Sequence, residues 1–139
     1  MKPHLLLALV LPLCFATVAL GDDKADTKDL ETGTWKVTNL NKNGKDAPAE
    51  ILEKAAPTFT FKDGGKLVIS NVGDAKEGTY KLDSTKTPKQ FDLKMDKNPD
   101  KAIYEITNET LKIAIGKNER PKDFTGGADV VVFTLKRMK

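Results

Sequence analysis

The chain has 139 residues, 39% of them hydrophobic and 31% charged, and its 23 basic residues against 20 acidic ones give a formal net charge of +3. This length fits one domain, and the near balance of charge argues against a nucleic-acid-binding module built on a basic face. The single cysteine, Cys14, and the single histidine, His4, lie in a segment that we expect to be removed. The mature chain would then lack a cysteine nucleophile, histidine for proton transfer or a Ser-His-Asp triad, and Cys or His zinc ligands.

The N-terminal segment has the features of a secretory signal peptide. A basic start precedes an apolar stretch over residues 5–20, and Ala19-Leu20-Gly21 provides a small-x-small exit. We expect cleavage after Gly21, so that residues 1–21 are the signal peptide. An uncleaved anchor needs about 20 apolar residues, whereas this stretch is shorter and contains Pro12. A lipoprotein would need a small residue before Cys14, where a leucine stands. The sequence therefore predicts an extracytoplasmic protein, periplasmic or secreted, with no membrane span after cleavage.

The mature chain alternates apolar and polar residues in eight short segments. Residues 22–29 first form a polar leader, which we expect to be disordered or to fray. The alternation that follows is typical of strands with one buried face. One short helix is expected at residues 49–56, between two prolines. The apolar members of the strands are Trp35 and Val37, Phe59 and Phe61, Leu67 and Ile69, Tyr80 and Leu82, Phe91, Leu93 and Met95, Tyr104 and Ile106, Leu111, Ile113 and Ile115, and Val131, Phe133 and Leu135.

These strands predict an all-β fold. Turn residues such as Asn43-Gly44 and Asn98-Pro99-Asp100 separate them, so consecutive strands can pair as hairpins. Eight such strands favour an antiparallel meander, and closing it into a barrel removes the edge strands. We expect an eight-stranded antiparallel up-and-down barrel over residues 30–139, with one short helix after the first strand. A two-sheet sandwich is the alternative.

Several linked motifs carry a resemblance to a known family. They are Gly33-Thr34-Trp35, Thr79-Tyr80-Lys81-Leu82-Asp83, Thr87-Pro88-Lys89, Phe91-Asp92-Leu93, Ile103-Tyr104-Glu105-Ile106, Thr110-Leu111-Lys112-Ile113 and Arg120-Pro121-Lys122-Asp123-Phe124. With these motifs, residues 30–137 resemble the small secreted lipocalin-like domain of planctomycete bacteria. The resemblance implies a lipocalin-like barrel but no activity. In lipocalins a basic residue of the last strand packs over the Gly-x-Trp tryptophan, so the resemblance implies that Arg137 packs over Trp35 and closes the barrel. The chain is short for a lipocalin, which argues against a large calyx.

The inner face of the barrel is the main candidate for a binding site. An eight-stranded barrel is just wide enough to be filled by side chains or to hold one small ligand. The residues expected to point inward could therefore form a pocket for a small apolar or amphipathic molecule, or an ordinary packed core. The hydroxyls of the two tyrosines among them need partners if they are buried. The inward set is Phe59, Phe61, Tyr80, Phe91, Met95, Tyr104, Ile113 and Phe133.

Other polar residues give weaker signals. Asp83 and Asp92 could act as an acid–base pair, but local turn and surface roles explain them better, because no nucleophile or histidine accompanies them. Residues 96–100 resemble the start of a calcium loop, yet the required later Gly and Glu are missing. Arg120 could bind an anion at the barrel mouth, or pair with an acid while Phe124 plugs the barrel. We therefore expect no catalytic residues, no metal and no cofactor.

From these observations we expect an exported, non-enzymatic, lipocalin-like domain. Its partner would be a small apolar or amphipathic ligand, or an envelope protein, and not nucleic acid. The alternative is a protein-interaction module with a fully packed barrel. The oligomeric state stays open at this point.

Overall fold

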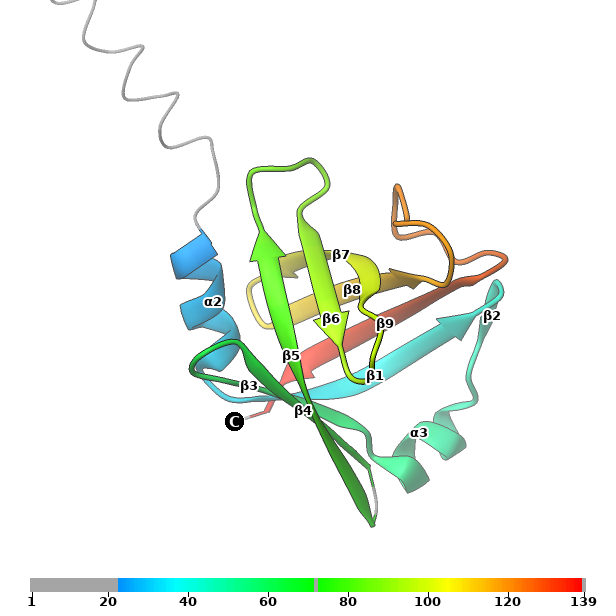
Figure 1. Cartoon of the computed structure of the whole chain (residues 1–139). Coiled ribbons are helices and arrows are strands. Elements are labelled where there is room, and N and C mark those ends of the chain that lie inside the picture. The colour runs from blue at the N-terminus through cyan, green and yellow to red at the C-terminus, as the bar shows by residue number, and fades with distance from the viewer. Residues whose placement is uncertain (1–22, 72, 139) are drawn as a thin grey trace, which may run out of the picture.

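The computed structural model describes residues 23–71 and 73–138, and it confirms the predicted barrel (Figure 1). The expected signal peptide at residues 1–21 lies outside the described residues. Two short helices accompany the strands in the described part of the chain. The elements are α2 (Asp23–Glu31), β1 (Thr34–Lys42), β2 (Lys45–Asp46), α3 (Ala49–Ala55), β3 (Thr58–Lys62), β4 (Lys66–Asn71), β5 (Asp74–Asp83), β6 (Gln90–Lys94), β7 (Asp100–Thr107), β8 (Thr110–Gly116) and β9 (Val130–Arg137).

The strands form one antiparallel sheet that closes on itself. Their order is β2-β1-β3-β4-β5-β6-β7-β8-β9, and β1 also pairs with β9, so β1 and β3 to β9 make an eight-stranded barrel. β2 only extends β1 as a two-residue hairpin arm. A register shift in β1 between Val37 and Asn39 bends the strand and moves its next inward position to Leu40. All eight predicted alternations lie on barrel strands because one face of each strand has to be buried.

The polar leader differs from its prediction. Residues 22–29 are expected to be disordered or to fray, whereas Asp23–Glu31 form α2. A nine-residue polar helix is too short to be stable alone in water. It is ordered here because Leu30 is fully buried against the barrel and because three aspartates bind barrel residues, as described below.

The two helices lie at opposite ends of the barrel (Figure 1). We call the end covered by α2 the closed end; it carries the β3–β4, β5–β6 and β7–β8 connections. The open end carries the β4–β5, β6–β7 and β8–β9 connections and α3. The predicted helix at 49–56 is one residue shorter in the structure, because Ala56 adopts a left-handed conformation and donates its N–H to the Leu52 carbonyl. Neither of the described helices is long and apolar enough to cross a membrane.

Candidate functional site

The structure places all eight predicted inward residues in or against one core. Six of them are buried members of the main hydrophobic cluster. Met95 and Phe133 are partly buried and pack against that cluster. Met95 fills the space above Gly78, where a Cβ atom would collide with its sulfur. The inner face is therefore apolar from one end of the barrel to the other.

Aromatic rings fill the middle of this core. Phe61 meets Tyr80 edge-on with ring centroids 5.0 Å apart, and Tyr80 stacks on Phe91 at 5.8 Å. Phe59 contacts Phe133 at 5.3 Å, nearer the open end. These are ordinary distances for favourable aromatic pairs, and such contacts leave little space between the rings. The barrel middle is a packed core rather than a wide calyx.

The inner face has partly buried side chains near both ends of the barrel. At the closed end Leu30, Trp35 and Leu111 are fully buried. At the open end Leu93 and Ala102 are also buried, but five other inward side chains there are only partly buried, and we call these five the open-end ring. Two other inward residues, Leu82 and Ile106, are partly buried near the closed end. The members of the open-end ring are Leu40, Ile69, Met95, Ile115 and Phe133.

The two tyrosine hydroxyls inside the barrel have different surroundings. Tyr104 donates to a carboxylate oxygen of Asp26 at 2.7 Å, and burial together with this hydrogen bond raises the Tyr104 pKa well above its usual value. The Tyr80 hydroxyl has no hydrogen-bond partner among the described residues. Burial, aided by the carboxylates of Glu31 and Asp63, raises the pKa of Tyr80 from 10.0 to about 12. Both phenols thus stay neutral over a wide pH range.

Three aspartates attach α2 to the closed end. Asp23 accepts hydrogen bonds from the N–H and hydroxyl of Ser84 in the β5–β6 connection. Asp26 also accepts from Lys89 Nζ at 3.0 Å. Asp29 pairs with Arg137 of β9 at 2.6 Å. The three lie at a spacing of three residues, so they share one helix face and reach three separate segments of the barrel rim.

Trp35 and Arg137 make the contact that the resemblance implies. The Arg137 guanidinium lies 4.7 Å from the Trp35 ring, within cation–π range. The indole N–H donates to the Leu30 carbonyl at 3.0 Å. The tryptophan is fully buried between the helix end and the last strand. This group holds the closed end together and offers no room for a ligand.

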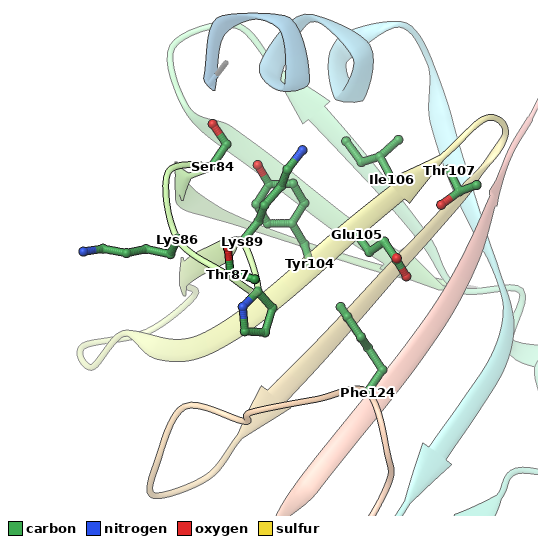
Figure 2. Close-up of a pocket in the computed structure, with 10 residues that line it drawn as sticks. Ser84, Lys86, Thr87, Lys89, Tyr104, Glu105, Ile106, Thr107 and Phe124 are labelled. Carbon is green, nitrogen blue, oxygen red and sulfur yellow. The ribbon is translucent and has the colours of Figure 1, made fainter. Parts of the chain in front are cut away.

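A separate cleft of about 470 Å³ lies outside the barrel, between two connections (Figure 2). The β5–β6 connection forms one wall, and Phe124 from the β8–β9 connection approaches from the other side. Glu105 and Thr107 of β7 contribute to the floor, and the closed-end residue Tyr104 borders it. Its volume is in the usual range for a small-molecule site, although the lining mixes charged, hydroxyl and apolar groups.

The β8–β9 connection is fixed to the outside of the barrel. Arg120 donates to the Ala102 carbonyl at 2.7 Å and forms an ion pair with Asp92 at 2.7 Å. Phe124 packs on a second small cluster formed by outward residues of β7, β8 and β9, including Ile103. The expectation that Arg120 pairs with an acid is confirmed. The expectation that Phe124 plugs the barrel is wrong, because the connection folds back over the outer surface.

The two carboxylates considered for acid–base chemistry are engaged separately. Asp92 binds Arg120, whereas Asp83 accepts hydrogen bonds from the N–H and hydroxyl of Thr85. These hydrogen bonds lower the pKa of the Asp83 carboxyl. A general acid would need the opposite shift. Across residues 23–71 and 73–138, no group of three or more acidic, His or Cys side chains could hold a metal ion.

Sequence reasoning missed the role of the aspartates in α2. The signal was the repeat of aspartate at every third position, over 23, 26 and 29.

Comparison with family models, curated proteins and solved structures gives no significant match.

Proposed function

We propose that this chain is an exported, non-enzymatic, lipocalin-like domain that binds a small apolar or amphipathic ligand at the open end of its barrel. The observation that supports the proposal is the open-end ring, where inward apolar side chains are only partly buried. The packed aromatic rings beneath it limit the site to a shallow one. The proposal includes membership of the small secreted lipocalin-like family of planctomycete bacteria, on the motifs given above.

The shape of the site suggests the class of ligand. Leu40, Ile115 and Phe133 offer hydrocarbon surface without a buried charge. An alkyl chain or a small ring could cover them, and its polar end would stay in water. Covering apolar surface gives about 25 cal/mol per Å², so a shallow site supports modest affinity.

The test is uptake of an environment-sensitive fluorescent naphthalene sulfonate, in the wild type and two matched variants. Ile115→Gln changes the open-end ring, and Ile106→Gln makes the same change in a partly buried inward residue near the closed end. We expect Ile115→Gln to weaken binding at least about fivefold, corresponding to about 1 kcal/mol, and Ile106→Gln to leave it unchanged. Ile106 also lines the outer cleft, so a loss confined to Ile106→Gln would move the site to that cleft and refute the proposal.

The second candidate is a protein-interaction module with a fully packed barrel. The close contacts among Phe61, Tyr80 and Phe91 favour it. Native mass spectrometry of the mature protein, purified from the envelope of its host, separates the two. A bound small molecule that is lost on denaturation supports the first candidate. A bare protein mass, with no uptake of the fluorescent probe, supports the second.

A further inference from the structure

Four neighbouring strands of the barrel carry no acidic residue. They are β9, β1, β3 and β4, which are adjacent in the closed sheet, and Figure 1 shows β1 running beside β9. Their outward positions include lysines and hydroxyl residues beside valines such as Val68 and Val132. We call this surface the basic face. It consists of Lys36, Lys62, Lys66 and Lys136 with Thr34, Thr58, Thr60, Ser70 and Thr134.

Two pairs of lysines on the basic face stand directly opposite one another. Lys36 pairs in register with Lys136, and Lys62 pairs with Lys66. Like charges at directly opposite positions of antiparallel strands destabilise a sheet. The ion pairs found among the described residues use Lys89, Arg120 and Arg137 and leave these four lysines out. The charge of the basic face is therefore held at a cost to stability and is available to an external anion.

Acidic residues lie around the basic face rather than on it. Glu77 of β5 is opposite Val68 of β4, and Asp63 lies in the β3–β4 turn. On the other side, Glu105 of β7 is opposite Lys112 of β8. The basic face therefore has a local positive potential, although the net charge of the whole chain is small.

The hydroxyl groups form a second recognition element. Thr34 and Thr60 are joined by a hydrogen bond of 3.1 Å, and Thr58 and Ser70 by one of 2.8 Å. Each hydroxyl can both donate and accept, so every pair retains capacity for a further partner. Lysines and hydroxyls together match a polymer that carries both carboxylates and hydroxyls.

We propose that the basic face binds an acidic polysaccharide. A membrane surface fits less well, because the two large hydrophobic side chains exposed in the described structure are Ile51 on α3 and Met138 after β9, whereas interfacial binding needs a larger apolar surface. A single-stranded nucleic acid needs aromatic rings for base stacking, and the outward positions of these four strands hold none.

The experiment measures binding of polygalacturonate at 50 and 200 mM NaCl by affinity electrophoresis. The test variant is the double change Lys36→Gln and Lys136→Gln. The matched control is Lys76→Gln with Lys81→Gln, two exposed lysines of β5. We expect about tenfold weaker binding at the higher salt concentration, because lysine contacts release counterions from a polyanion. We expect the test variant to weaken binding about fivefold or more, and the control less than about twofold.

Each other outcome overturns the proposal. Equal weakening by the two variants would show that general charge, and not the basic face, binds the polymer. The proposal would also be overturned by absence of binding at 50 mM NaCl, by equal binding of neutral dextran, or by a preference for anionic lipid vesicles. The test variant relieves a repulsion, so its Tm should not fall. This inference is independent of the proposed function, since Ile115→Gln should leave polygalacturonate binding unchanged.

Discussion

The attachment of α2 can be tested by a double-mutant cycle between Asp26 and Tyr104. The Asp26 carboxylate is about four-fifths buried and accepts from the Tyr104 hydroxyl at 2.7 Å and from Lys89 at 3.0 Å. A hydrogen bond to a charged group contributes about 1.5–3 kcal/mol. Lys89 is more than one-third exposed, so its ion pair contributes below about 1 kcal/mol. Asp26→Ala should therefore destabilise the domain by about 2–3 kcal/mol.

Tyr104→Phe removes the same hydrogen bond from the other side. The Asp26 carboxylate then keeps Lys89, so we expect a cost of about 1–2 kcal/mol. In the Tyr104→Phe background the hydroxyl–carboxylate hydrogen bond is already absent, so Asp26→Ala removes only the ion pair with Lys89. The double variant should therefore cost about 1–2 kcal/mol less than the sum of the single changes.

The assay is urea unfolding at neutral pH, followed by circular dichroism and by the fluorescence of the single tryptophan, Trp35. Lys28→Ala is a suitable control because this exposed residue lies on the same helix, and a change of less than about 0.5 kcal/mol is expected. Additivity of Asp26→Ala and Tyr104→Phe within about 0.3–0.5 kcal/mol would refute the reasoning. It would mean that the hydroxyl–carboxylate contact contributes nothing to holding α2.

Three further predictions concern the core. Because the pKa of Tyr80 is raised from 10.0 to about 12, the contribution of Tyr80 to folding stability should be complete below pH 10 and be lost as the pH rises from 10 toward 12. The folded protein should therefore show no ultraviolet absorbance of tyrosinate near pH 10, and a normal titration in the folded protein would contradict this. Arg137→Ala should lower the free energy of unfolding by about 1–2 kcal/mol, because it removes the contact with Trp35 and the ion pair with Asp29. It should also increase acrylamide quenching of tryptophan fluorescence, and unchanged quenching would argue against the contact. Gly78→Ala should lower the free energy of unfolding by about 1–3 kcal/mol, because the new methyl group would collide with Met95. A urea midpoint equal to that of the wild type would show that the side chains around Gly78 can rearrange to accept the methyl group.

The barrel was predictable because each strand shows its buried face independently. In Phe59 and Phe61, or Phe91 and Leu93, alternation alone identifies the inward side. Tight turns then leave hairpin pairing as the simplest connection. The filled interior was less predictable, because the same inward residues suit a pocket and a packed core.

Other features depend on contacts between distant parts of the chain. α2 has too little apolar surface to be recognised by periodicity, and its order depends on Ser84, Lys89 and Arg137. The placement of Phe124 depends on Arg120 reaching Ala102 and Asp92 across the outer surface. The basic face depends on the pairing of the first and last barrel strands. No local pattern shows that Lys36 lies opposite Lys136.

That pairing also determines when the fold can be completed during synthesis. β1 is the first barrel strand to be made and β9 the last, yet they pair over almost their whole length, from Trp35–Arg137 to Lys42–Val131. Until the C-terminal residues are available, β1 and β8 each keep an unpaired edge that can recruit another chain. A ribosome stalled within the last strand would therefore hold an open sheet instead of a barrel. Loss of Val130–Arg137 should consequently cause aggregation and not merely a less stable monomer.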